Sequence, residues 1–338
     1  MQTLIPGDTY DVVKARLETS CARISSPFVY AVWNQSCDRM ELLSHAQFKT
    51  HFKYLTFYRP ASDDRPAHMA SCFVQTWLLD YHKQTCDKIV IDPTQPPGPL
   101  ATVFNQFPGF KAAQLPPVPD ADVEGLVQPI MRHVLDVIVA GYARKAAWFM
   151  DWLAVQVQHA QHKQIGVVVN GERGCGKSIL ADFFGEKVLG PRCSFHTTDA
   201  KRNVVAKFAH GVVCTVFLHV KQEVVSLGDN WDRLRHLVSD DTIFYEERHK
   251  RGGQIKNLMH VYMTTENTTE NMLCWRFALF QASNVHVGDT SYFTGLRTHL
   301  ARPEVARAFY QFLMARDLSQ FRAFVHPPER YLSQQNVD

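Results

Sequence analysis

Eight consecutive residues form the part of the sequence with the most specific chemistry. They match the G-x-x-x-x-G-K-S pattern of phosphate-binding loops: Gly171, Glu172, Arg173, Gly174, Cys175, Gly176, Lys177 and Ser178. Glycines allow backbone N–H groups to turn inward around a polyphosphate, because no Cβ is in the way. In such a loop the lysine reaches the β- and γ-phosphate oxygens, and the serine hydroxyl binds Mg²⁺. The segment therefore predicts a nucleotide site that holds ATP and Mg²⁺.

An acidic residue is the second requirement for nucleotide hydrolysis, because a carboxylate must hold the metal's water or polarise the attacking water. The apolar run that begins at Val212 ends in Glu223. We expect Glu223 to act as the general base and to bind Mg²⁺ through water. A strand that ends in a surface glutamate would look the same. The preceding residue, Gln222, stands where an acid or asparagine is more common, and Glu246 or Glu247 would be the next candidates.

Four basic or imidazole side chains lie between two strand-like arms of the segment 242–256. They are Arg248, His249, Lys250 and Arg251, and Gly252-Gly253 supplies the turn. Positive charge at the tip of a hairpin neutralises phosphates without reading bases, so the pattern favours contact with DNA. A solvated surface turn would have a similar composition.

Two further residues have the types found around a γ-phosphate. The apolar, strand-like run Leu258–Met263 leads to Asn267, whose amide would sense that phosphate. Arg276 follows nine residues later and is a candidate arginine finger, a cation that stabilises charge in phosphoryl transfer. Asparagine and arginine residues are also common in purely structural roles.

The elements that must position the phosphate-binding loop are recognisable on both sides of it. Ile165–Val169 is a short, apolar, β-branched run, which predicts a strand buried on both faces. After the loop, apolar residues recur at helical spacing: Ile179, Leu180, Phe183, Phe184, Val188 and Leu189. Gly190-Pro191 ends this helix. Strand, loop and helix follow in the order that phosphate binding needs, and the helix amino end adds partial positive charge.

From the sequence we expect the whole chain to consist of four parts. They are an amino-terminal accessory module over 1–92, a Pro-rich connection over 93–130, an ATPase domain over 131–300 and a helical tail over 301–338. Nine of the 17 prolines lie between Pro93 and Pro129, so we expect no regular helix there. In the flanking parts we expect a strand over Phe28–Trp33, a helix near Ser44 and an amphipathic helix over Pro303–Arg316.

The composition constrains the fold and the function only loosely. The chain has 338 residues, 46% of them hydrophobic, which suffices for buried cores in about two domains. The balance of 36 basic against 33 acidic residues gives a net charge of +3, too weak to indicate nucleic acid by itself. The eight cysteines include no C-x-x-C pair, so their spacing predicts no zinc site. No signal peptide or membrane-spanning run is present, and we expect an intracellular protein of the cytoplasm or nucleus.

The order of the motifs resembles that of the superfamily 3 helicases, which are AAA+ ring motors of viruses and mobile elements. The sequence is most similar to the helicase domain of phage and virophage primase-polymerases, from about Phe28 to Phe280. The resemblance includes the motifs above and three further stretches: Trp152-Leu-Ala with Gln158, Ile91-Asp-Pro93, and Asn105-Gln-Phe-Pro-Gly109.

The resemblance implies a role for each matching residue. Lys177 and Ser178 would bind nucleotide and metal. Glu223 would activate water, and Asn267 would sense phosphate. Gln222 departs from the family pattern, which has an acid or asparagine there.

The resemblance also implies contacts beyond one subunit. Arg276 would reach into the neighbouring subunit's site, and Lys250 with its flanks would line a DNA channel. Trp275 departs from the pattern, since the family often has a second arginine at that position.

We therefore expect an α/β fold of the P-loop NTPase type, AAA+-like, with a small amino-terminal α/β module. The expected function is ATP-driven movement on single-stranded or forked DNA as a homo-oligomeric, hexameric ring in viral or mobile-element replication. Any primase or polymerase would be on another chain. The alternative is a hydrolysis-poor, nucleotide-dependent DNA-binding or assembly protein, which Gln222 favours. A small-molecule kinase is a second alternative, but it would not need the basic hairpin.

Overall fold

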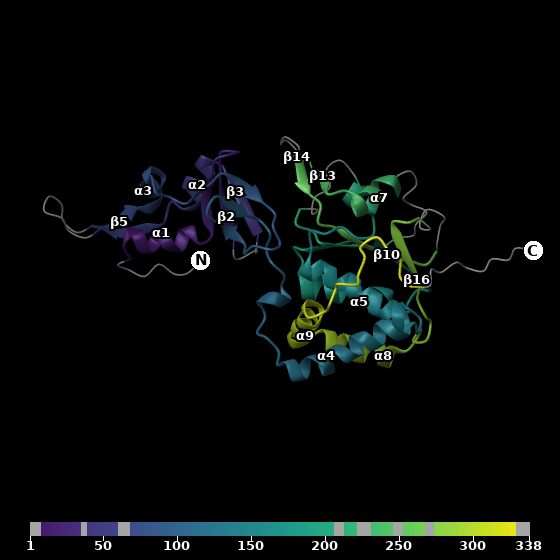
Figure 1. Ribbon diagram of the computed structural model, residues 1–338. Coiled ribbons are helices and arrows are strands. Elements are labelled where there is room, and N and C mark those ends of the chain that lie inside the picture. The colour runs from purple at the N-terminus through teal and green to yellow at the C-terminus, as the bar shows by residue number, and fades with distance from the viewer. Residues whose placement is uncertain are drawn as a thin grey trace, which may run out of the picture. The chain divides into compact units, whose positions relative to one another are not determined.

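The computed structural model describes residues 8–34, 39–59, 68–205, 213–221, 231–245, 253–267 and 274–328. The chain divides into two compact units, Met1–Pro108 and Gly109–Asp338 (Figure 1). The first unit thus reaches further into the Pro-rich segment than the predicted boundary at residue 92. Within the described ranges, no helix has the length and apolar character needed to cross a membrane.

The first unit is built around a four-stranded sheet with the order β3-β2-β1-β6. Its elements are α1 (Tyr10–Glu18), β1 (Cys21–Ile24), β2 (Val29–Asn34), β3 (Arg39–Leu43), α2 (His45–His51), β4 (Thr56–Arg59), β5 (His68–Cys72), α3 (Phe73–Leu79) and β6 (Thr85–Cys86). Aromatic side chains fill its core, with the rings of Tyr30 and Phe48 stacked 4.4 Å apart. The helix expected near Ser44 is confirmed. Ser44 and Gln47 form a reciprocal capping box at its start.

The first unit also contains a second, smaller sheet. It has the order β7-β9-β8 and contains β7 (Lys88–Val90), β8 (Gly98–Pro99) and β9 (Val103–Asn105). The Asn105 side chain is fully buried and holds the loop after β7. Its Nδ2 donates to the carbonyl oxygens of Asp92, Gln95 and Pro96, and its Oδ1 accepts from the N–H groups of Asp92 and Phe107. Asn105 therefore organises this proline-rich turn.

The second unit contains a five-stranded sheet in which all strands are parallel, with the order β11-β12-β15-β10-β16. The strands are β10 (Gly166–Asn170), β11 (Ser194–Thr197), β12 (Phe217–Lys221), β15 (His260–Thr265) and β16 (Phe277–Gln281). Val167, Val168 and Val169 are fully buried, which confirms the expected doubly buried strand. Because the strands are parallel, the segments that follow β10, β12 and β15 all begin at one edge of the sheet.

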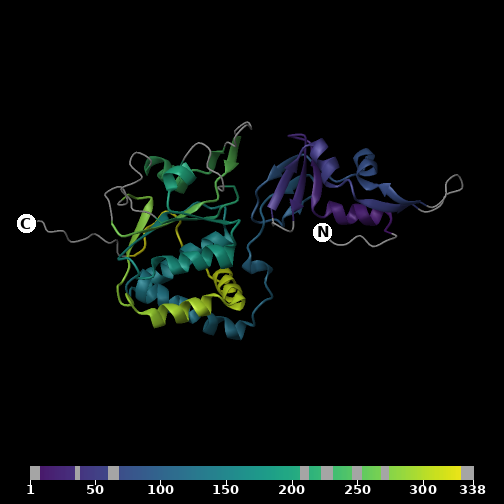
Figure 2. The ribbon, with the colours of Figure 1, turned by 180° about the vertical axis from the view of Figure 1, so that it is seen from behind.

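Helices cover both faces of this sheet. They are η1 (Ala112–Gln114), α4 (Asp120–His133), the π-helical η2 (Val134–Ile138), α5 (Ala143–Gln158), α6 (Lys177–Phe183), the π-helical η3 (Phe184–Leu189) and η4 (Lys201–Val205), α7 (Trp231–Ser239), α8 (Thr290–Leu300) and α9 (Pro303–Met314). Figures 1 and 2 show α4, α5, α8 and α9 on one side. On the other side lie α7 and the strands β13 (Thr242–Tyr245) and β14 (Gly253–Lys256). Trp152 on α5 donates its indole N–H to the carbonyl of Ile165, 2.7 Å away, and so holds α5 beside the start of β10.

Helix α4 shows that the expectation of no regular helix between Pro93 and Pro129 is wrong. The helix begins directly after Pro119 and continues through Pro129. Pro129 has no N–H to donate, which normally destabilises a helix interior. Burial of Val127 and Ile130 on α4 offsets this loss, and α4 packs on α9. The expected carboxy-terminal helix, α9, also contacts α5, so it is part of the same helical layer rather than a separate tail.

Candidate functional site

The segment 171–176 joins the buried strand β10 to helix α6, and its backbone path requires glycine at two positions. Gly174 and Gly176 have φ angles of +85° and +107°, which residues with a Cβ rarely adopt. A Cβ on Gly176 would in addition lie 2.9 Å from the side chains of His133 and Phe293. The strand and the helix that the sequence predicts around this loop are both confirmed.

Lys177 is the first residue of α6 and folds back onto its own loop. Its Nζ donates to the carbonyl oxygens of Gly171 and Glu172, at 2.5 and 2.6 Å. From β15, Tyr262 donates its hydroxyl to the carbonyl of Lys177, 3.0 Å away. Lys177 is only 8% exposed, yet it lines a cavity. Its charge is therefore held at a point where water screens it little.

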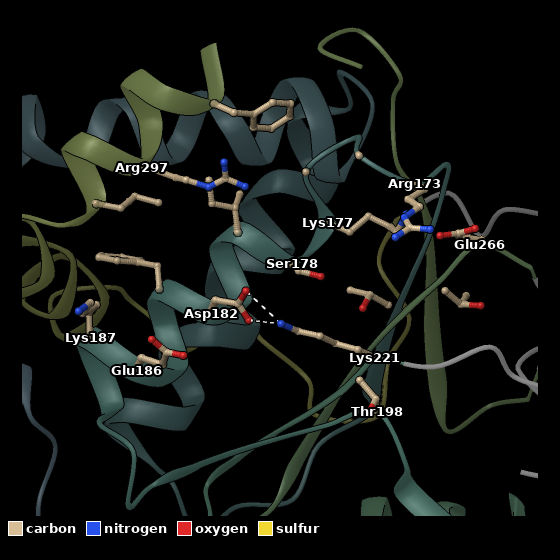
Figure 3. A pocket seen from close by; sticks show the side chains of 18 of the residues that line it. Arg173, Lys177, Ser178, Asp182, Glu186, Lys187, Thr198, Lys221, Glu266 and Arg297 are labelled. Carbon is tan, nitrogen blue, oxygen red and sulfur yellow. Dashed lines mark hydrogen bonds and ion pairs between the residues drawn. The ribbon is translucent and has the colours of Figure 1, made fainter. Parts of the chain in front are cut away.

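A cavity of about 800 Å³ opens beside the loop (Figure 3). Its walls come from the loop, from α6 and η3, from the carboxyl ends of β12 and β15, and from α8. Five cationic side chains line it against three carboxylates: Arg173, Lys177, Lys187, Lys221 and Arg297 against Asp182, Glu186 and Glu266. Small-molecule sites commonly measure about 300–1,000 Å³. The size suits a nucleotide, and the excess of positive charge suits a polyphosphate.

Arg297 is a cavity residue that the sequence pattern did not indicate. It lies on α8 and lines the cavity, and Figure 3 shows its side chain extending from α8 toward α6. A guanidinium group is always charged and matches the geometry of phosphate oxygens. No sequence pattern indicated this role, because nothing in residues 290–300 distinguishes Arg297 from an arginine on a solvated helix.

His133, at the end of α4, is a second residue that the sequence did not indicate. Its Nε2 lies 3.2 Å from the carbonyl oxygen of Gly176, and its Nδ1 lies 2.8 Å from the hydroxyl of Tyr292 on α8. Burial lowers the pKa of His133 to about 4, so the ring is neutral at neutral pH. A carbonyl only accepts, so Nε2–H donates to Gly176 and Nδ1 accepts from Tyr292. His133 thus fixes the loop to two helices.

Asp182 and Lys221 form an ion pair on the cavity wall, with Lys221 Nζ 2.7 Å from Oδ1 of Asp182 (Figure 3). His196 and His219 lie beside the same carboxylate. Burial alone would raise the pKa of Asp182, but His196, His219 and Lys221 outweigh it and hold that pKa well below the ordinary value. Burial lowers the pKa of His219 to about 4. At neutral pH this wall therefore carries a carboxylate, a cation and a neutral imidazole.

Asn267 follows β15 at the same edge of the sheet as the phosphate-binding loop. Its backbone is fixed by Thr265, whose hydroxyl donates to the Asn267 carbonyl at 2.8 Å and accepts from the Asn267 N–H at 3.1 Å. Thr264, Thr265 and Glu266 line the cavity, while Asn267 is exposed next to them. The structure brings the segment to the cavity and puts Glu266, one residue earlier, on its wall.

Arg276 precedes β16 and lies at the other end of the sheet. Its Nε is 3.3 Å from the hydroxyl of Ser239, and its guanidinium carbon lies 4.3 Å from the ring centre of Trp275. β16 runs parallel to β10, and a five-residue strand spans about 17 Å. The length of the sheet thus separates Arg276 from the phosphate-binding loop of its own chain.

The remaining predicted site residues lie outside the described residues. They are Gln222, Glu223, Glu246, Glu247, Arg248, His249, Lys250 and Arg251. The structure does describe the elements that flank them. Strand β12 ends at Lys221, and β13 pairs with β14 in antiparallel register from Thr242 with Lys256 to Tyr245 with Gly253. The two strand-like arms expected around the basic segment are therefore confirmed.

Comparison with known proteins agrees with this architecture. A family of unknown function (DUF5906) matches residues 169–273. No curated protein matches the chain. Three apo structures of the NrS-1 C-terminal region have TM-scores of 0.63, 0.65 and 0.63 at 14%, 16% and 15% identity. Each match covers 91% of this chain and 68% of the other. At this identity the likeness shows the fold alone, a mixed α/β architecture consistent with nucleotide binding.

Proposed function

We propose that the chain is an ATPase that moves on single-stranded or forked DNA as a homo-oligomeric ring, in the replication of a viral or mobile genome. One observation carries the proposal. A G-x-x-x-x-G-K-S segment lies between a doubly buried parallel strand and a helix, and it opens into a positively charged cavity of about 800 Å³. Strand, loop and helix in this arrangement hold polyphosphates through backbone N–H groups and a lysine.

Three cavity residues and Glu223 would then each have a chemical task. Lys177 would pair with the β- and γ-phosphate oxygens, and Ser178 would hold Mg²⁺ together with Glu223 acting through water. Mg²⁺, when bound, would supply charge neutralisation at the transferring phosphoryl group. Arg297 would approach the phosphates from α8. Glu223 would also polarise the attacking water.

The position of Arg276 supports a ring. An arginine at the far end of its own sheet has no access to its own phosphates, whereas a neighbouring copy could present it there. The β13–β14 arms would carry the basic residues 248–251 to DNA, where cations contact phosphates irrespective of sequence. Hexameric rings are what the superfamily 3 resemblance implies, and any primase or polymerase activity would belong to a separate partner chain.

Gln222 favours a second candidate function. An amide next to Glu223 brings no negative charge to Mg²⁺, so Glu223 would provide the catalytic electrostatics alone. The chain would then bind ATP and DNA but hydrolyse slowly, as an assembly component. Steady-state ATP hydrolysis with and without single-stranded DNA separates the two candidates. Turnover stimulated by DNA supports the motor, tight ATP binding with negligible turnover supports the assembly protein, and absence of ATP binding contradicts both.

Neutralising the basic segment is expected to change the salt dependence of DNA binding. The variant Arg248→Ala/Lys250→Ala/Arg251→Ala should bind single strands more weakly. Its plot of log affinity against log salt concentration should be flatter, by about 0.7 for each phosphate that the variant leaves unneutralised. Fluorescence anisotropy at several salt concentrations measures this slope. The matched control is Lys256→Ala on the described arm β14, and a slope equal to wild type in the triple variant would reduce the segment to a surface turn.

Replacing Arg297 tests the contribution of α8 to the site. Arg297→Ala should weaken ATP binding by about tenfold to a hundredfold, since a hydrogen bond to a charged group contributes about 1.5–3 kcal/mol. Titration with a fluorescent ATP analogue measures the affinity. Arg302→Ala, which removes an arginine paired with Glu304 just beyond the same helix, should bind as wild type. Equal affinity in both variants would show that α8 contributes no phosphate ligand.

A further inference from the structure

We propose that Asp182, His196 and His219 form a binding site for a divalent cation of the zinc class, separate from the Mg²⁺ that accompanies ATP. Their ligand atoms come from three elements, α6, β11 and β12. Among the described residues this is the group of histidine, cysteine and acidic side chains whose donor atoms converge closely enough to share one ion. The inference does not depend on nucleotide binding.

The fold of the backbone brings the three donor atoms together. Strands β11 and β12 are parallel neighbours, and His196 is the register partner of His219, so the two rings lie side by side on one face of the sheet. Asp182 lies on α6, four residues after Ser178, and η3, which directly continues α6, contacts both strands. Gly185, in the following turn, leaves room for the His196 ring: a Cβ at Gly185 would lie 2.6 Å from Nε2 of His196. Sheet register, helix and glycine together bring three donors to one point.

The donor atoms are spaced like the ligands of one tetrahedral ion. Nδ1 of His196 lies 3.2 Å from Nδ1 of His219, and Oδ1 of Asp182 lies 3.4 and 3.5 Å from these two nitrogens. Bonds of about 2.0–2.2 Å to tetrahedral zinc place neighbouring ligands about 3.3–3.6 Å apart. The two contacts to Asp182 are longer than the usual 2.7–3.2 Å of an N–H···O hydrogen bond. The triangle therefore fits a shared ion better than direct hydrogen bonds to the carboxylate.

The surroundings of His219 favour a ligand role. Its Nε2 lies 3.2 Å from the hydroxyl of Thr264 on β15, and its Nδ1 faces the other two donors. When Nε2–H donates to Thr264, the lone pair of the neutral ring is on Nδ1 and points into the triangle. Metal-ligating histidines commonly have such a partner on the second nitrogen, because it fixes the tautomer and the ring orientation.

The donor set identifies the class of ion, and the neighbouring cavity provides its route of entry. Two imidazoles and one carboxylate suit Zn²⁺, whereas Mg²⁺ prefers oxygen ligands in octahedral geometry. His219 is fully buried, but Asp182 and Lys221 line the cavity, so an ion can reach the triangle from that side. Lys221 Nζ lies 2.7 Å from the same Oδ1 and competes with the ion for the carboxylate. Zn²⁺ and Lys221 are therefore alternative partners of Asp182.

Titration of the full chain with Co²⁺, followed by displacement with Zn²⁺, tests the proposal. We expect one equivalent of Co²⁺ per chain to give the visible absorption of tetrahedral cobalt, and Zn²⁺ to abolish it. Asp182→Asn and His196→Gln should each lose this absorption. Thr264→Val, which removes the partner of His219, should weaken binding about tenfold to a hundredfold. Lys221→Met should tighten it, by about two- to fivefold, because a half-exposed competing ion pair is removed.

Two controls make the outcome decisive. His159→Gln/His162→Gln removes an exposed pair of stacked histidines on another surface and should keep the absorption unchanged. Lys177→Ala should also keep the Co²⁺ absorption. This variant therefore distinguishes loss of the cation site from loss of ATP binding. Circular dichroism of each metal-free variant verifies that it is folded. If His196→Gln does not fold, Asp182→Asn still tests the site, because Asp182 is partly exposed. Absent absorption in wild type, or absorption that survives Asp182→Asn, would overturn the proposal.

Discussion

Replacing Lys177 with alanine is expected to reduce ATP hydrolysis to a small residual rate while the fold is retained. Lys177 is the cation that the phosphate-binding loop itself holds on the cavity wall, through the carbonyl oxygens of Gly171 and Glu172. Loss of one preorganised donor to a developing charge lowers turnover by about a hundredfold to a thousandfold. Steady-state hydrolysis at saturating ATP measures the loss.

The same variant has a predictable effect on stability. Two carbonyl oxygens lose a donor, and the free energy of unfolding should fall by about 1–3 kcal/mol. Urea unfolding measures this and verifies that the variant is folded. Lys187→Ala is the matched control, since Lys187 lines the same cavity but lies on η3, away from the loop. Wild-type turnover in Lys177→Ala, or an equal loss in both variants, would contradict the role assigned to the loop.

Mixing two inactive variants is expected to restore activity if Arg276 acts on a neighbouring subunit. Arg276→Ala should be inactive because each site lacks its finger, and Lys177→Ala because each site lacks its loop cation. In a mixed ring some interfaces hold an intact loop from one chain and an intact Arg276 from the other. Arginine fingers contribute about three to five orders of magnitude in rate, so this rescue should be large.

The geometry of Arg276 makes the mixing experiment interpretable. Its guanidinium contacts Ser239 and Trp275 at the edge of the sheet opposite the loop, so a direct effect within one chain is not expected. Arg276→Lys keeps the charge but loses the planar group and should remain defective. Equal melting temperatures of Arg276→Ala and wild type exclude a folding defect. Absence of rescue at concentrations where mixed rings demonstrably form would leave Arg276 with a structural role only.

Local patterns predicted the elements around the loop well. The run 165–169 has the β-branched composition of a doubly buried strand, and the structure places β10 there. The arms on both sides of the basic segment 248–251 and the helix that begins after Ser44 were also expected, because turn glycines and helix-start residues act within a few positions.

Other elements depended on contacts between distant parts of the chain. Proline density suggested no helix over 93–129, yet α4 forms because its apolar face is buried against α9. Arg297 belongs to the cavity only because α8 packs beside a loop that is distant in sequence. The spacing of the cysteines predicted no zinc site, and the Asp182 cluster arises from the register of two strands that the sequence does not reveal. Pairing partners and helix packing are non-local, and residue patterns contain little information on them.

The close packing at Gly176 has a mechanical consequence. The Cα of Gly176 has no free volume toward His133 and Phe293, and the Gly176 carbonyl accepts the His133 ring N–H. A movement of the loop backbone in that direction must displace the ends of α4 and α8, because protein interiors are close-packed and transmit strain. His133 also contacts Tyr292, so both helices receive the displacement together. The loop and the ends of α4 and α8 are thus linked through His133, so a change in the loop backbone is coupled directly to the helical layer.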